Sequence, residues 1–399
     1  MADRSSSRTF ATRLAAGVGC ALFAACGERG GEPAFTARDS AGVRIAESRR
    51  PSWAPGQEWT VAAAPLADVA VGREPFLATR LADGRIAVAE EWTVTLFGPR
   101  GERTGTVIRP ASWPTEIDWI GTAGDSLLVW QPSRLSIYTP GGRLGREVRP
   151  EGLQYLDPRM VGRLVDGTLL LTGGHQQPVQ VGPPQRGLVA YLWAGPDGAP
   201  RGRFADLPDV KRVYVGAAGA FEVPFSTRTL VALSGDEVLV GDNAAFELAV
   251  FGRDGTLRRV LRRPWEPLAV ERSDVVAHHT ALEPRYPATS AEMRAMLQRM
   301  RQERLARIPH DTVFPAFTGL LAGPDGSVWA EEPRHAHDFS PRWSVFAPDG
   351  RWLGTVTMPS RFELRQVGAD WVLGSEPDGA GVLHARVYPL VRPAGGSAP

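Results

Sequence analysis

A turn-and-strand unit that recurs along the chain is the feature that most constrains the fold. In its clearest copy, at residues 321–356, a Pro-Asp-Gly turn at 324–326 precedes a short apolar run, a polar connector, a second apolar run and another Pro-Asp-Gly turn at 348–350. Asp-Gly pairs favour tight reversals because glycine tolerates positive φ, and runs rich in Val, Trp and Phe favour strands. Together with the apolar run at 317–321, the unit predicts a meander of four short strands.

Five further copies follow the same order. Their turns lie at residues 83–84, 124–125, 166–167, 235–236 and 368–370. Where nothing is inserted, the turns recur about every 41 to 44 residues, the period of a four-stranded propeller blade. A β-sandwich would also contain many short strands, but it would not repeat one ordered series of turn, strand, connector and aromatic-ended strand. We therefore predict an all-β fold over residues 39–392: a six-bladed β-propeller of four-stranded antiparallel blades.

The final unit supplies only three strands before the chain runs out. Residues 393–399 contain Pro and Gly and predict a disordered tail. A missing fourth strand would leave an unpaired edge, which invites aggregation. We therefore expect an N-terminal strand to complete this unit, with Trp59–Ala62 as the first candidate and Val43–Ala46 as the alternative.

A large insertion at residues 262–312 interrupts the period and predicts one helix. Thr289 and Glu292 have the spacing of a capping box. The apolar side chains that follow share one face of this helix: Met293, Met296, Leu297 and Met300. Such a face fits either packing on the propeller or a groove for a partner, and we expect packing because apolar helical spacing is the ordinary sign of a buried face.

Residues 1–25 have the pattern of a signal peptide. Three arginines precede an apolar run at 14–25 that is too short to span a bilayer. The run ends in Ala24-Ala25-Cys26, which resembles the bacterial lipobox, in which the cysteine thiol is acylated; an ordinary cleaved signal peptide is the alternative. We expect a lipid on Cys26, a tether at 26–38, membrane contact through the lipid alone, and an exported location in the cell envelope, at the outer membrane or periplasm rather than the cytoplasm.

Cysteine usage and charge exclude several function classes. Both cysteines of the sequence, Cys20 and Cys26, precede the predicted propeller, so the propeller has neither a disulfide nor a thiol catalyst. Basic and acidic residues number 45 and 44, and this balance gives no reason to expect a nucleic-acid partner. Serine-hydrolase, zinc-protease, phosphate-loop and dinucleotide motifs are absent from the sequence.

These repeats resemble six-bladed β-propellers of the NHL-like kind that occur in exported bacterial proteins. The resemblance covers nearly all of the chain after the leader and is clearest at residues 39–47, 239–255 and 321–356. Members of such families bind ligands or proteins, and relatives with similar blades include metal-dependent lactonases and lyases. The resemblance therefore implies a monomeric binding module for a small molecule or protein at the top face, with a metal-dependent hydrolase or lyase as the alternative.

Polar residues recur where the second strand of each unit ends. Second strands run toward the same face in every unit, so these residues should gather there. They are Glu90, Glu91, Asp242, Asn243, Glu331, Glu332 and Glu376. Such a group predicts raised carboxylate pKa values or a bound cation. The Pro-Phe pairs at 75–76 and 224–225 should place aromatic rings near this mouth, where we expect them to pack between blades rather than to stack on a ligand.

One connector adds histidines to the carboxylates. Its potential metal ligands are Glu331, His335, His337 and Asp338. Carboxylate oxygens and imidazole nitrogens suit calcium or zinc, so a divalent cation is the one cofactor that the sequence suggests. The interpretation that we favour is a solvated polar loop, because loops collect such residues in any protein.

Replacing Cys26 with Ala should release the protein into the soluble fraction, because the several acyl chains of a lipoprotein cysteine provide stable attachment. Fractionation of cells that produce Cys26→Ala measures this, and Cys20→Ala serves as the matched control. Membrane retention of Cys26→Ala would contradict a lipid anchor at this residue.

Overall fold

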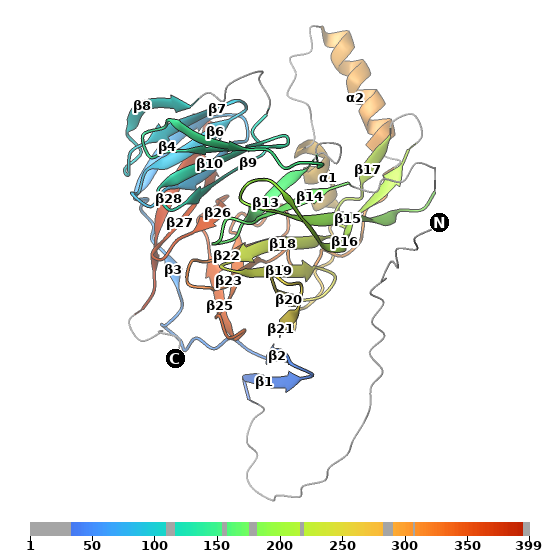
Figure 1. Cartoon of the computed structure of the whole chain (residues 1–399). Helices are drawn as coiled ribbons and strands as arrows, with labels where there is room; N and C mark the ends of the chain where they lie inside the picture. The colour runs from blue at the N-terminus through green and yellow to red at the C-terminus, as the bar shows by residue number, and fades with distance from the viewer. Residues whose placement is uncertain are drawn as a thin grey trace, which may run out of the picture. The chain divides into compact units, whose positions relative to one another are not determined.

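Strands are the main secondary structure of the described residues, and hydrogen bonds join them into six sheets. The computed structural model (Figure 1) describes residues 33–108, 116–153, 158–174, 182–215, 219–281, 290–305 and 308–393. Cys26, Thr289 and the tail from residue 394 lie outside these ranges. The expected tether at 26–38 overlaps the first strand, which begins at Phe35.

Three sheets contain four strands each in chain order. The first comprises β5 (Leu77–Arg80), β6 (Ile86–Glu90), β7 (Thr93–Phe97) and β8 (Arg103–Ile108). The second comprises β9 (Trp119–Ala123), β10 (Ser126–Gln131), β11 (Arg134–Tyr138) and β12 (Leu144–Val148). The third is the unit from which the repeat was defined: β22 (Gly319–Ala322), β23 (Val328–Glu331), β24 (Arg342–Phe346) and β25 (Trp352–Thr357).

Two further sheets carry additional strands. One comprises β13 (Arg159–Arg163), β14 (Leu169–Gly173), β15 (Gln185–Ala194), β16 (Pro200–Tyr214) and β17 (Ala220–Glu222). The other comprises β18 (Thr229–Ser234), β19 (Glu237–Asp242), β20 (Glu247–Gly252) and β21 (Leu257–Arg262). Its outer strand pairs in parallel with β2 (Val43–Ser48), which in turn pairs with β1 (Phe35–Ser40).

The last sheet joins the two ends of the propeller. Its C-terminal strands are β26 (Glu363–Val367), β27 (Trp371–Pro377) and β28 (Leu383–Val391). An N-terminal strand, β4 (Ala67–Gly72), pairs antiparallel with β28, and β3 (Thr60–Val61) pairs with the end of β28. Closure from the N-terminal side is therefore as expected. The principal closing strand was not predicted, because Trp59–Ala62 supplies only the two residues of β3 and Val43–Ala46 lies in another sheet.

The first strands of the six sheets form a closed ring. Each contacts the next in the order β5, β9, β13, β18, β22 and β26, and β26 contacts β5 again. Buried apolar clusters lie between neighbouring sheets all around this ring. Trp329 and Phe346 are fully buried in two of them, and burial of such a side chain contributes roughly 2–3 kcal/mol. The all-β propeller class is thereby confirmed.

The insertion is helical, as predicted, but it contains two helices where the sequence predicted one. They are α1 (Arg272–Ala281) and α2 (Ala291–Leu305). Ser290 caps α2, since its hydroxyl accepts a hydrogen bond from the amide of Met293 (3.1 Å). Met293 and Met296 are 44% and 49% exposed, and Figure 1 shows α2 projecting beyond the sheets, so the expected packing of these two side chains is also wrong. Neither helix is long and apolar enough to cross a membrane.

Candidate functional site

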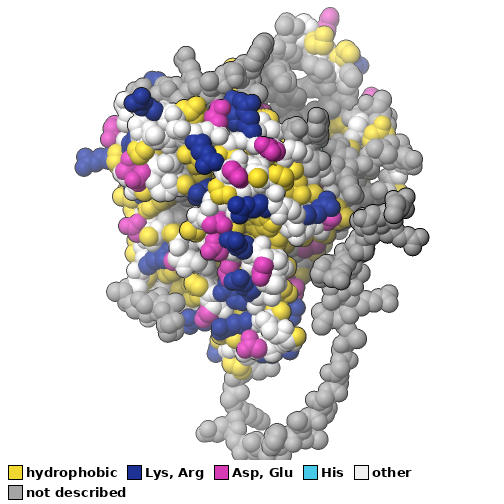
Figure 2. Space-filling model, viewed as in Figure 1, with side chains coloured by type: hydrophobic (Ala, Val, Ile, Leu, Met, Phe, Trp, Pro, Cys, Tyr) yellow, Lys and Arg dark blue, Asp and Glu magenta, His cyan; other side chains and the backbone are white. Residues whose placement is uncertain are grey.

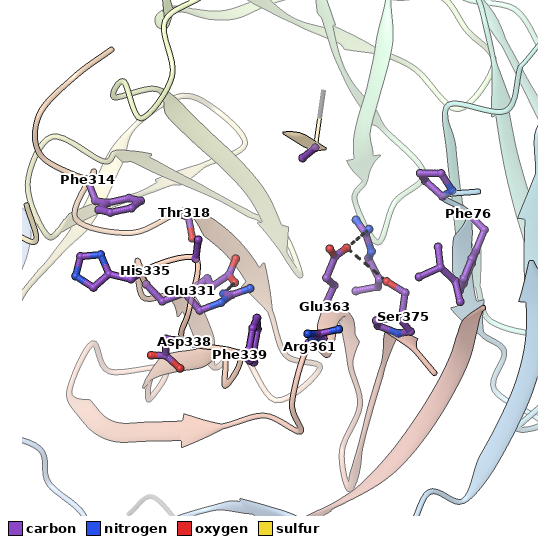
Figure 3. Close-up of a pocket in the computed structure, with 17 residues that line it drawn as sticks. Phe76, Phe314, Thr318, Glu331, His335, Asp338, Phe339, Arg361, Glu363 and Ser375 are labelled. Atoms are coloured by element: carbon purple, nitrogen blue, oxygen red, sulfur yellow. Dashed lines mark hydrogen bonds and ion pairs between the residues drawn. The ribbon is translucent and has the colours of Figure 1, made fainter. Parts of the chain in front are cut away.

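A pocket of about 810 Å³ lies where the connector between β23 and β24 meets the closing sheet. Figure 3 shows side chains from both sides converging on it. The connector contributes His335 and Phe339, the turn between β25 and β26 contributes Arg361, and β27 contributes Ser375. The last residue of α1, Ala281, also lines the pocket.

The chain just after β4 completes the wall of the pocket. Pro75 and Phe76 line it on one side, and Pro377 and Leu383 of the closing sheet line it nearby. Leu383 pairs with both Pro377 on β27 and Gly72 on β4. The pairing of β4 with β28 that closes the ring therefore also forms this wall of the pocket. Phe76 is 5% exposed because it also packs in the layer between the closing sheet and the β5–β8 sheet.

Most charged side chains in the pocket are already paired. Glu331 accepts from Arg334 (2.5 Å), and Glu363 accepts from Arg365 (2.8 Å) and from the hydroxyl of Ser375 (3.4 Å). Pairs held in this way are oriented before a ligand arrives, so little ordering is required on binding.

Asp338 is also engaged, by a hydrogen bond from the amide of Ser340 (3.0 Å) and by Arg342 (3.0 Å). The Ser340 amide is the main cause that lowers the pKa of Asp338, burial opposes it, and Arg342 adds to the lowering. Asp338 therefore stays ionised at neutral pH and holds the connector in shape.

Three of the other carboxylates expected at the mouth each have their own partner. Glu332 pairs with Arg263 (3.0 Å), Asp242 with Arg186 (3.0 Å) and Glu376 with Arg386 (2.9 Å). Individual neutralisation removes the need for a shared cation. Figure 2 shows basic and acidic side chains interspersed over the displayed face, so this face has no extended patch of positive or negative charge.

Three further predicted residues have distinct environments. Asn243 is 1% exposed and structural: its amide group donates to the carbonyl of Phe317 (2.8 Å), and its oxygen accepts from the amide of Arg228 (2.7 Å). Glu91 lies in the turn after β6 with a φ of 43°. Burial, and then the charge of Glu91, raise the pKa of Glu90, so the expected upward shift occurs at this one of the predicted carboxylates.

His335 connects the pocket to helix α1 through Asp274, a residue that the sequence analysis missed. Nδ1 of His335 hydrogen-bonds to Oδ2 of Asp274 (2.9 Å), and the amide of Ala336 donates to Oδ1 (2.7 Å). The same carboxylate accepts from the amide of Glu271 (2.8 Å) and so caps the helix. Asp274 is buried, and the ring of His337 stacks on His335 at 5.2 Å between centroids.

The ligand atoms of Glu271, Asp274 and His335 all lie within 4.8 Å of one another. This group shares only His335 with the expected metal ligands, because Arg334 and Arg342 hold Glu331 and Asp338. The two oxygens of Asp274 already accept three hydrogen bonds. These hydrogen bonds tie the start of α1 to the β23–β24 connector, so the arrangement fits a structural link between the two better than a metal centre.

The known proteins to which this chain is similar are solved structures alone. No family model matches the sequence, and no curated protein matches it. Among solved structures, the chain is similar to a member of the DUF4221 family from Bacteroides vulgatus, with 12% identity over 84% of this chain and 99% of that chain and a TM-score of 0.48.

Two other solved structures are similar. A gluconolactonase from Xanthomonas campestris is 16% identical over 82% of this chain and 92% of that chain, with a TM-score of 0.40. The Pan2 WD40 domain of Neurospora crassa is 11% identical over 85% and 97%, with a TM-score of 0.38. The propeller class rests on this chain's own sheets, and these likenesses carry nothing about what it binds.

His335→Gln should destabilise the protein more at low pH than at high pH. The hydrogen bond to Asp274 raises the pKa of His335 above its usual 6.5, and Glu271 and Asp338 add to this. The stabilisation that the charged form of His335 provides is therefore fully present below pH 6.5 and is lost as pH rises through the raised pKa. For Asp274, burial opposes ionisation, but the hydrogen bonds from His335 and the backbone outweigh it and lower its pKa, so it stays charged throughout.

Melting temperatures at about pH 5 and about pH 9 measure this difference. Exposed His310 provides the matched control His310→Gln. If His335→Gln lowers the melting temperature by the same amount at both pH values, a charged hydrogen bond from His335 to Asp274 that links α1 to the connector is contradicted.

Proposed function

We propose that this chain is an NHL-like β-propeller that acts as a binding module and takes a small molecule in the pocket beside the β23–β24 connector. The pocket volume of about 810 Å³ carries the proposal, because small-molecule sites enclose roughly 300–1,000 Å³. Its position at the ends of second strands agrees with the face on which the sequence predicts ligand binding.

The lining offers both apolar contact and fixed polar groups. Phe76, Phe314 and Phe339 present aromatic rings to the pocket. The Glu331–Arg334 and Glu363–Arg365 pairs present charges at fixed places. Aromatic surface combined with oriented polar groups is what a site for a small organic ligand needs, and the many charged residues of this lining favour a polar or charged ligand.

The alternative class, a metal-dependent hydrolase or lyase, has less support. Such an enzyme would need a cation with an open coordination position at which water or a carbonyl is activated. In the part of the chain that the structure describes, coordinating atoms come together at Glu271, Asp274 and His335, and the carboxylate of Asp274 already accepts three hydrogen bonds. This arrangement favours binding without chemistry.

The proposal includes the location of the module. Acylation at Cys26 would attach the propeller to a membrane of the cell envelope through residues 27–34, and the fractionation of Cys26→Ala described above tests it. The pocket would then face the extracytoplasmic medium, from which it would take its ligand.

Filling the pocket should abolish ligand-induced stabilisation. Ala336 is exposed and lines the pocket, so Ala336→Trp places an indole in the ligand space without disturbing a buried layer. Phenylacetate, benzylamine and benzamide represent the anionic, cationic and neutral aromatic ligands. At least one should raise the melting temperature of the native protein but not that of Ala336→Trp, because a ligand stabilises only the state that binds it.

The matched control is Ala244→Trp, at an exposed alanine in the β19–β20 connector and outside the pocket lining. It should respond to the same compound as the native protein does. If none of the three compounds shifts the melting temperature, or if Ala336→Trp responds like the control, the pocket is not the ligand site.

A further inference from the structure

Arg361 differs from the other arginines of the pocket in its backbone. It is the third residue of the turn at 359–362, in which the amide of Phe362 donates to the carbonyl of Pro359 (3.1 Å). Its φ is 60°, in the left-handed region that favours glycine or asparagine. A residue with a Cβ is strained there, and such strain is characteristic of functional positions.

Two contacts hold Arg361 against the β23–β24 connector. Its amide donates to the carbonyl of Phe339 (2.6 Å), and its guanidinium lies over the ring of Phe339 at 4.3 Å from the centroid. Figure 3 shows the two side chains next to each other in the wall of the pocket. A guanidinium that stacks by its face keeps its edge available for hydrogen bonds.

Arg361 also lacks the counter-charge that its neighbours have. Arg334 pairs with Glu331 and Arg365 with Glu363. No carboxylate among the described residues lies within ion-pair distance of Arg361, which is exposed to the pocket. The pocket therefore contains one cation whose partner must be solvent or a ligand.

We propose that Arg361 binds the carboxylate of a small monocarboxylate that has an aromatic or other apolar body. A guanidinium edge matches a carboxylate, since two parallel N–H groups can donate to its two oxygens. Phe339, the exposed ring on which Arg361 stacks, would contact the body of the same molecule. This inference rests on the proposed function and specifies the class of ligand.

The remaining charges restrict the ligand further. The Glu331–Arg334 and Glu363–Arg365 pairs are neutral overall, so Arg361 offers a single uncompensated charge, which a monoanion matches and a multiply charged anion such as phosphate exceeds. A cationic amine would have to compete with Arg334 and Arg365 for those carboxylates. The free guanidinium therefore favours a monocarboxylate over both.

Arg361→Asn tests the inference, because asparagine tolerates positive φ but carries no charge. The variant should melt at a temperature no lower than that of the native protein, whereas its dissociation constant for phenylacetate, measured by titration, should be at least about tenfold weaker. Arg100→Asn, at an exposed arginine in the turn between β7 and β8, should bind phenylacetate like the native protein.

The outcomes separate this inference from the proposed function. If phenylacetate binds Arg361→Asn as tightly as it binds the native protein, Arg361 is not the carboxylate partner. If benzylamine or benzamide binds in a manner sensitive to Ala336→Trp while phenylacetate does not bind, the pocket is a ligand site and the inference is wrong. If none of the three compounds binds, both the inference and the proposed function are wrong.

Discussion

Pairing between β4 and β28 is the interaction on which the rest of the structure depends. The other five sheets take their central strands from continuous stretches of chain, whereas this sheet combines residues 67–72 with residues 363–391. The first strands contact one another around the whole ring, so a break at one sheet would expose an edge and loosen the layers on both sides. Contacts between such distant residues also imply slow folding.

The candidate site depends on the same closure. Phe76 follows β4 directly, while Pro377 and Leu383 belong to the strands that β4 completes. The opposite wall comes from the β23–β24 connector, which the buried carboxylate of Asp274 fastens to α1. Two long-range attachments thus hold the walls, and the pocket can keep fixed charges such as the Glu363–Arg365 pair in place for a ligand.

The repeated turns made the fold predictable, because their glycines have the positive φ that Asp-Gly pairs suggest, as at Gly84 and Gly326. The closing strand was missed because the sequence of 67–72 is rich in Ala, Asp and Gly, which are uncommon in strands. The alternation of buried Ala67 and Val69 with exposed Asp68 was a usable signal.

The site was predictable only in part. Of the residues named from the sequence, Glu90, Asp242 and Glu376 are not part of the pocket lining, whereas Glu331, His335 and Asp338 line the pocket. Their partners could not be read from spacing, because Asp274 lies 61 residues from His335 and belongs to a helix with little amphipathic pattern. Arg361 was missed because its significance depends on backbone conformation and on the absence of a carboxylate nearby, neither of which a sequence displays.

Hydrogen exchange of the backbone amides of β4 tests the ring closure most directly. Amides that bond β4 to β28 should exchange as slowly as those of β10 at the centre of the second sheet, because both would open only when the ring unfolds. Fast exchange throughout residues 67–72, with slow exchange retained in β10, would show that the ring holds together without this pairing and would contradict the account.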